Sequence, residues 1–80
     1  MGSRGLTGAG TRYIAGELRA QQSRKQWTLD EIEVLTGVPR STVNRALKGE
    51  GTLAVETLIQ LCAGMQIDVV ALMRDAAKQV

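Results

Sequence analysis

Two short amphipathic segments separated by Gly37-Val38-Pro39 constrain the fold of this chain more than any other feature. Thr28 to Glu31 reads T-L-D-E, a capping box in which each end side chain bonds the backbone N–H of the other residue. A helix is therefore predicted over 29–36, and Gly37 ends it because glycine tolerates a left-handed backbone. Pro39 suits the first turn of a second helix over 40–48. The two helices must meet at a tight corner.

The two faces of the second helix differ in character. Val43, Ala46 and Leu47 recur at helical spacing and predict its buried side. The opposite side is rich in hydrogen-bond donors and has no acid: Ser41, Asn44, Arg45 and Lys48. One face is thus expected to anchor the helix, while the other offers guanidinium and amide groups outward. An ordinary solvated helix face is the alternative interpretation.

Helical periodicity also accounts for the rest of the chain from Thr11 onward. Thr11 is expected to cap a helix over about 12–24, and two further helices are predicted over about 54–65 and 69–78, the last capped by Asp68. The side chains expected to point inward are Ile14, Leu18, Leu29, Ile32, Leu35, Val55, Leu58, Ile59, Cys62 and Met65. No strand pattern or internal repeat appears, so the sequence predicts an all-α fold, a compact bundle of about five short helices.

The 80 residues leave room for one domain. Residues 1–10 contain four glycines and no apolar periodicity, which predicts a flexible arm before a domain over 11–80. Arg4 in this arm could reach a phosphate or a minor groove. An idle terminus is the simpler interpretation.

Composition disfavours several classes of function. The chain has no His, and its single Cys, Cys62, lies on an apolar stripe that favours a core role over a nucleophile. Carboxylate pairs, phosphate loops and metal-ligand spacings are missing, so we expect no enzyme, no metal and no cofactor. An unpaired Cys, together with the lack of a signal-peptide core or an apolar run of roughly 18 residues, favours a cytoplasmic protein without membrane contact.

The charge distribution says more than the formal net charge of +2 at pH 7. Basic residues dominate 1–27 and 40–48, whereas 30–33 is acidic. This pattern favours a one-sided positive surface, although an ordinary mixed surface remains an alternative. Trp27, the only Trp, is expected to seal the joint between two helices; stacking on a base is the other interpretation.

The segment TLDEIEVLTGVPRSTVNRALKG, residues 28–49, resembles the helix-turn-helix of bacterial and phage repressors. VETLIQLCAGMQIDVVALM, residues 55–73, looks like the fourth and fifth helices of the Xre-type, lambda-repressor-like (Cro-like) family. The resemblance covers about 11–73. It implies a transcription regulator, most simply a repressor, whose helix 40–48 lies in the major groove of a double-stranded DNA operator. A winged helix-turn-helix is the alternative fold, but no hairpin signal follows Lys48.

The resemblance places four residues toward base edges: Arg40, Ser41, Asn44 and Arg45. The chemistry agrees, because Arg bonds guanine O6 and N7 as a fork and Asn bonds adenine N6 and N7. Phosphate contacts are expected from five further residues around the motif: Thr28, Leu29, Thr42, Lys48 and Thr52.

The sequence departs from the family pattern at several positions. Leu29 stands where the family often has Gln, and Glu33 where it usually has Ala. We hypothesise that Glu33 tilts outward and orients Arg40. Gln22 and Leu47 together replace an Arg–Glu pair between the first and third helices, so no buried charge is left alone. Gln66 replaces a Gly that commonly ends the fourth helix.

The apolar residues of the predicted helix 69–78 cover more than one face, which indicates an interface. We expect a homodimer on a palindromic site, with Val69, Val70, Met73 and Ala77 between the two copies. Alternatively, Val69, Val70, Leu72 and Met73 all fill the chain's own core. They could also bind a toxin partner, which would make the protein an antitoxin, or belong to an interaction module that has lost DNA binding.

Overall fold

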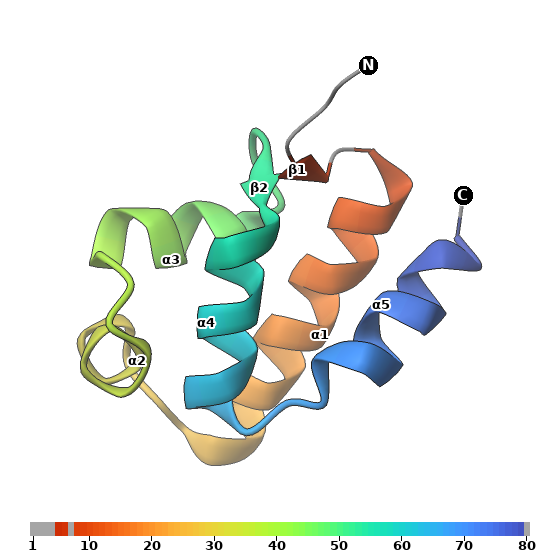
Figure 1. Cartoon of the computed structure of the whole chain (residues 1–80). Coiled ribbons are helices and arrows are strands. Elements are labelled where there is room, and N and C mark those ends of the chain that lie inside the picture. The colour runs from red at the N-terminus through yellow and green to blue at the C-terminus, as the bar shows by residue number, and fades with distance from the viewer. Residues whose placement is uncertain (1–4, 7, 80) are drawn as a thin grey trace.

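The structure is a computed structural model that describes residues 5, 6 and 8–79. Its helices are α1 (Ala9–Lys25), α2 (Leu29–Thr36), α3 (Arg40–Lys48), α4 (Val55–Met65) and α5 (Val69–Ala77). Two short strands, β1 (Gly5–Leu6) and β2 (Leu53–Ala54), pair antiparallel with Gly5 opposite Ala54. The all-α class is therefore confirmed, with one minimal strand pair that the sequence did not predict (Figure 1).

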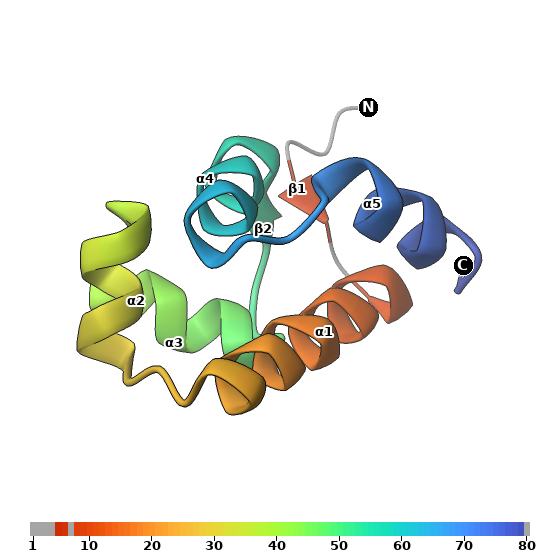
Figure 2. The ribbon, with the colours of Figure 1, turned by 90° about the horizontal axis from the view of Figure 1, so that it is seen from below.

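The helices are arranged so that the predicted corner projects at one end of the molecule. α2 packs against α3 and α4, whereas α1 packs against α3 and α5. Seen from two directions, α2 and α3 lie at one end and α5 lies at the other (Figures 1 and 2). Helices α4 and α5 follow α3 where a winged protein would have a hairpin, so the winged alternative does not describe this fold.

One cluster of apolar side chains joins all the helices. Its largest fully buried members are Ile14, Leu18, Ile32, Val43, Leu58, Leu61, Cys62 and Met65. Leu72 and Ala76 attach α5 to the cluster, and Trp27 is half-buried against it. The predicted core role of Cys62 is confirmed, whereas Trp27 packs against the core and stays partly exposed.

Local signals set the bounds of α2 and α3 where they were predicted. The Thr28 hydroxyl accepts a hydrogen bond from the Glu31 N–H at 3.1 Å, and Glu31 Oε1 accepts one from the Thr28 N–H at 2.8 Å. Gly37 ends α2 with φ of 75°. Asp68 caps α5 as expected, since its carboxylate accepts the N–H groups of Val70 and Ala71.

The start of α1 was predicted wrongly. The helix begins at Ala9, after Gly8 with φ of 76°, and so inside the segment assigned to the arm. Thr11 is not the cap; it is 3% exposed and shares the buried face of α1 with Ile14 and Leu18, because these positions follow helical spacing. Thr11 Oγ1 has no hydrogen-bond partner in the part of the chain described. Arg4 lies outside the described residues.

Three apolar side chains expected in the core are instead exposed. Leu35, Val55 and Ile59 have 44%, 43% and 50% of their surface accessible. In α4 the buried stripe consists of Leu58, Leu61, Cys62 and Met65. The true stripe is therefore displaced around the helix from the predicted one, which leaves Val55 and Ile59 at its edge.

Two contacts lock α4 to its neighbours. A Cβ atom on Gly64 would lie 2.5 Å from the Leu35 carbonyl oxygen and 2.8 Å from Thr36 Cα, so only glycine allows this approach of α4 to the end of α2. Gln21 is buried in α1 and donates from Nε2 to the Met65 carbonyl at 2.9 Å. Its Oε1 accepts from Arg24 Nη2 at 2.6 Å, so both ends of this buried amide are bonded.

Candidate nucleic-acid interface

α3 has one buried and one exposed face, as predicted. Val43, Ala46 and Leu47 are 1%, 6% and 6% exposed. On the other side Arg40, Ser41 and Arg45 are exposed and Asn44 is half-buried. The four side chains expected to face bases are therefore accessible from solvent.

A small polar hollow of about 100 Å³ lies on one side of α3. Thr42 and Arg45 from α3 and Thr52 from the following loop line it, together with Glu50 and Thr57. The Arg45 guanidinium rests against this loop, since a Cβ atom on Gly51 would lie 3.1 Å from its Nη2. Two predicted phosphate contacts, Thr42 and Thr52, are thus brought to the same place.

A second hollow of about 530 Å³ lies on the side of α3 that faces α1 and α2. It brings together three predicted contact residues, Leu29, Asn44 and Lys48, and adds Arg19 and Gln22 from α1. Sequence reasoning missed Arg19, whose Nη1 donates to the Leu47 carbonyl. The spacing of three between Arg19 and Gln22 puts them on one helix face and was the available signal.

The N-terminus of α2 is partly occupied by its own capping box. The Thr28 N–H and the Glu31 N–H are both bonded within that box. A phosphate approaching this end would therefore meet the N–H groups of Leu29 and Asp30 and the exposed side chain of Thr28.

Arg40 is held by Asp30 and not by Glu33. Arg40 Nη1 lies 3.0 Å from Asp30 Oδ1, and the two side chains are 60% and 72% exposed. Within the described residues Glu33 makes no salt bridge, so the hypothesis that it orients Arg40 is wrong. The long Arg40 side chain reaches the first turn of α2, whereas Glu33 lies one turn further along and is half-buried. An exposed pair of this kind contributes only about 0–1 kcal/mol to stability.

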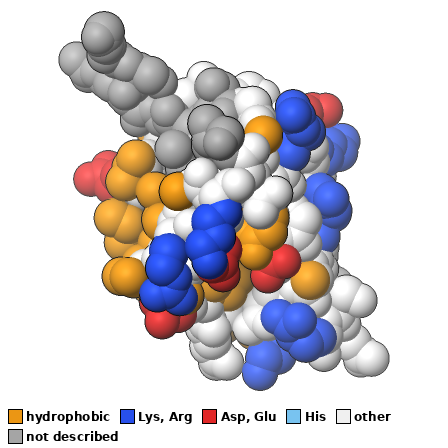
Figure 3. Space-filling view, turned by 90° about the vertical axis from the view of Figure 1, so that its right-hand side faces the viewer, with side chains coloured by type: hydrophobic (Ala, Val, Ile, Leu, Met, Phe, Trp, Pro, Cys, Tyr) orange, Lys and Arg blue, Asp and Glu red, His pale blue; other side chains and the backbone are white. Residues whose placement is uncertain are grey.

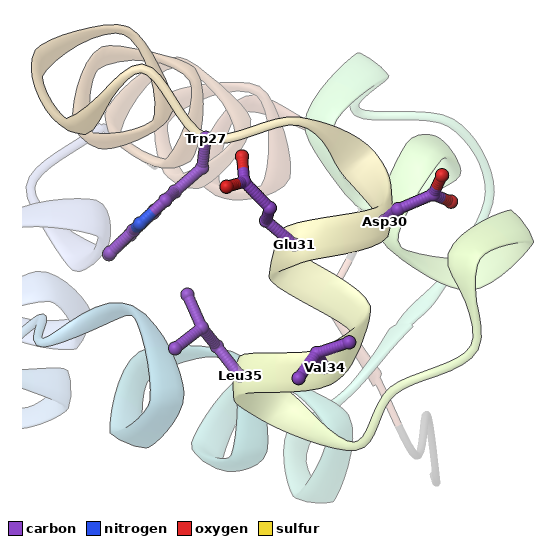
Figure 4. A pocket seen from close by; sticks show the side chains of 5 residues that line it. All are labelled: Trp27, Asp30, Glu31, Val34 and Leu35. Carbon is purple, nitrogen blue, oxygen red and sulfur yellow. The ribbon is translucent and has the colours of Figure 1, made fainter.

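Two apolar hollows lie outside these polar ones. The first, about 340 Å³, is lined by Trp27, Asp30, Glu31, Val34 and Leu35, with the Trp27 and Leu35 side chains pointing toward it (Figure 4). The second, the α4–α5 groove, has a volume of about 310 Å³ and is lined by Val55, Leu58, Ile59, Val69, Val70 and Met73. Figure 3 views the side of the molecule that carries α5, where exposed hydrophobic side chains gather. Three of the residues expected at a dimer interface line this groove, while Ala77, the last residue of α5, is exposed.

Burial, with a smaller effect from Asp68, raises the pKa of the Cys62 thiol to about 11, so little thiolate forms at neutral pH. The described residues contain no group of three or more His, Cys, Asp or Glu side chains placed to hold a metal ion. None of the described helices combines the length and apolar character that crossing a membrane requires.

The helix-turn-helix family model HTH_3 matches residues 17–72, from the second half of α1 to the first turn of α5. The chain belongs to this helix-turn-helix family. The resemblance to Xre-type, lambda-repressor-like regulators is thereby confirmed, and this helix-turn-helix protein has the fold of DNA-binding transcription regulators. No curated protein sequence matches it significantly.

Solved structures of regulators share the fold of the helix-turn-helix protein. The wild-type restriction-modification controller protein C.Esp1396I is 11% identical with a TM-score of 0.74, and the match covers 90% of this chain and 94% of that one. The clp gene regulator ClgR from C. glutamicum is 19% identical with a TM-score of 0.73, over 92% of this chain and 95% of that one. At these identities the likeness is one of fold alone.

Proposed function

We propose that this helix-turn-helix protein binds a specific double-stranded DNA sequence by placing α3 in the major groove. The separation of α3 into a buried face and an exposed polar face supports this proposal most directly. Its apolar face is fixed in the core, while Arg40, Ser41, Asn44 and Arg45 remain accessible to solvent. A major groove admits an α-helix, and these side chains have the donors and acceptors that distinguish base pairs there.

The two hollows beside α3 present hydroxyl and ammonium groups that suit the phosphates bordering a major groove, with the Glu50 carboxylate also in the lining of both. A duplex that receives a helix presents one backbone strand on each side of it. Thr42 and Thr52 line the hollow on one side, and Leu29 and Lys48 line the hollow on the other. With Thr28 at the start of α2, these are the phosphate contacts that we propose.

The α4–α5 groove supports a homodimer. Val55, Ile59 and Val70 are 43%, 50% and 71% exposed, and a second copy would remove this apolar surface from water. Two copies related by a twofold axis would read a palindrome with recognition helices about 34 Å apart. Val69, Val70, Met73 and Ala77 belong to the proposed interface, and α3 stays free because it contributes nothing to the groove.

Occupancy of a promoter by such a dimer would block transcription, so we propose a repressor. A regulator of bacterial or phage genes acts where the DNA lies, in the cytoplasm. Binding itself is the step to test first, because repression depends on it.

We call Arg40, Ser41, Asn44 and Arg45 the proposed reading face of α3. The decisive experiment removes its two arginines. Duplexes selected from a random pool by the wild-type protein provide the operator, and gel-shift titration measures affinity. Arg40→Ala combined with Arg45→Ala should weaken operator binding by about 2–6 kcal/mol, since each bidentate contact contributes about 1–3 kcal/mol of discrimination. Circular dichroism should remain helical, because both side chains are exposed.

A matched control removes two charges elsewhere. Arg74→Ala with Lys78→Ala takes the same charge from α5 and its C-cap, where these side chains are 66% and 71% exposed. This control should retain most of the operator affinity. Selection that enriches no sequence, or an Arg40/Arg45 variant that binds like the wild type, would reject the proposed site.

The dimer is tested by Val70→Lys, which places a charge in the groove. Sedimentation equilibrium should change from a dimer to a monomer, and affinity for the full palindrome should fall toward that for a half-site. Val34→Lys is the control, because Val34 is 84% exposed but lies on α2, outside the groove. A wild-type protein that sediments as a monomer, or a Val70→Lys variant that remains dimeric, contradicts the proposed interface.

A further inference from the structure

The ion pair between Asp30 and Arg40 joins the two helices of the motif at the proposed reading face. Arg40 is the first residue of α3, Asp30 is the second residue of α2, and Arg40 Nη1 lies 3.0 Å from Asp30 Oδ1. We propose that Asp30 is a specificity-determining residue, which holds Arg40 by one nitrogen and thereby selects the guanidinium edge that meets a guanine. This inference rests on the proposed function, because it concerns how Arg40 reads DNA.

Arg40 has enough N–H donors to bond Asp30 and a guanine at the same time. A guanidinium has five N–H donors on three nitrogens. Within the described residues only Nη1 of Arg40 is bonded, and its partner is Asp30. The edge formed by Nε and Nη2 remains available, and two parallel donors are what guanine O6 and N7 accept. Asp30 thus bonds one side of the Arg40 guanidinium and leaves two parallel donors, on Nε and Nη2, available on the other side.

Asp30 lies in the first turn of α2, where its charge suits the helix dipole, but it takes no part in the capping box. Thr28 and Glu31 cap α2 between themselves. The Asp30 carboxylate is exposed and points away from the side chains of Trp27 and Leu35 (Figure 4). Its hydrogen bond to Arg40 is therefore its principal described interaction.

A carboxylate at this position should also lower affinity for DNA of arbitrary sequence. An arginine free to turn can bond a phosphate in any sequence, and such contacts give affinity without discrimination. Asp30 competes with phosphates for the Arg40 guanidinium, so phosphate contacts of Arg40 that break this bond are penalised. It should lower affinity for arbitrary DNA more than affinity for the operator.

The test is Asp30→Asn, which keeps the shape of the side chain and removes its charge. Affinity is measured for the selected operator, for operators changed at the base pair that Arg40→Ala ceases to discriminate, and for a scrambled duplex at several salt concentrations. Preference for the operator base at that position should fall about fivefold to tenfold. Binding to the scrambled duplex should tighten, and its salt dependence should steepen by about one released ion.

Two controls separate this role from charge alone. Glu33→Gln removes the same charge from α2 but breaks no described contact with Arg40, so base preference should stay at the wild-type value. In an Arg40→Ala background, Asp30→Asn should have no further effect on base preference. Unchanged or increased preference in Asp30→Asn, or an equal loss in Glu33→Gln, overturns the inference while wild-type operator binding keeps the proposed function intact. A wild-type protein without operator preference overturns both.

Discussion

At the scale of single residues, burial determines the chemistry of Cys62. The thiol is 1% exposed in the core, and its pKa rises from 9.0 to about 11. Because the folded state disfavours the thiolate, the unfolded chain loses this proton first as the pH rises. The stability that the neutral thiol provides is complete below about pH 9 and is lost as the pH approaches 11.

We therefore expect the free energy of unfolding to fall by about 1–3 kcal/mol between pH 8.5 and 11, as a pKa shift of this direction and size requires. Urea titrations across this range measure the change. Cys62→Ala should be less stable at neutral pH but should show a shallower alkaline decline. A smaller slope should remain, because the pKa of Tyr13 is also raised, by desolvation and by Glu17. An equally steep decline without the thiol would contradict this explanation.

The contact between Asp30 and Arg40 marks the limit of sequence reasoning at this scale. Asp30, Glu31 and Glu33 are the carboxylates that the sequence places on α2, and spacing alone does not choose between them. The choice depends on the path of the Arg40 side chain and on the bond that already commits Glu31 to Thr28. The residue types of the reading face were predictable from sequence, but their partners were not.

At the scale of elements, local signals predicted most of the fold. The capping box, Gly37 and Pro39 gave the bounds of α2 and α3, because a cap is decided by a few adjacent residues. The buried side of α4 was predicted less well, because a periodic pattern does not determine which positions of the helix its neighbours will cover. The start of α1 was also missed. The positive φ of Gly8 sets it, whereas the sequence offered Thr11 as the more obvious cap.

The approach of α4 to α2 gives a prediction for Gly64. Gly64→Ala should destabilise the protein by about 1–3 kcal/mol, because the added Cβ would overlap the backbone of Leu35 and Thr36. It should also weaken operator binding, since α2 and α3 must shift together. Gly16→Ala is the matched control, because the nearest atom to its Cβ is Arg19 Nη2 at 3.8 Å. This control should stabilise α1 by about 0.5–1 kcal/mol. Equal melting temperatures for the two variants would contradict a close contact between α4 and α2 that requires glycine at position 64.

At the scale of the whole molecule, a single apolar cluster supports every helix. A chain of this size buries a small core, so few side chains carry much of its stability. Helices that share one cluster should unfold together. The interface proposed for α3 therefore depends on side chains at the other end of the domain.

Trp27 makes this cooperativity measurable, because the only Trp packs against the cluster. Its fluorescence and the helical circular dichroism should follow one urea transition. Leu58→Ala, at a residue that is 0% exposed, should move both signals together and cost about 2–5 kcal/mol. Val34→Ala, at an 84% exposed residue, should change stability by less than about 0.5 kcal/mol. Two separate transitions would indicate that the motif unfolds independently of the rest.

The separation of the two faces of α3 has a consequence for how such a protein changes its target. Val43, Ala46 and Leu47 hold the helix in place, and none of them is among the side chains proposed to touch bases. Under the proposed function, substitutions at the outward positions would change the recognised sequence one base pair at a time and leave the scaffold intact. The exposed residues of α3 could then vary independently of its buried ones, so relatives with the same backbone could control different genes.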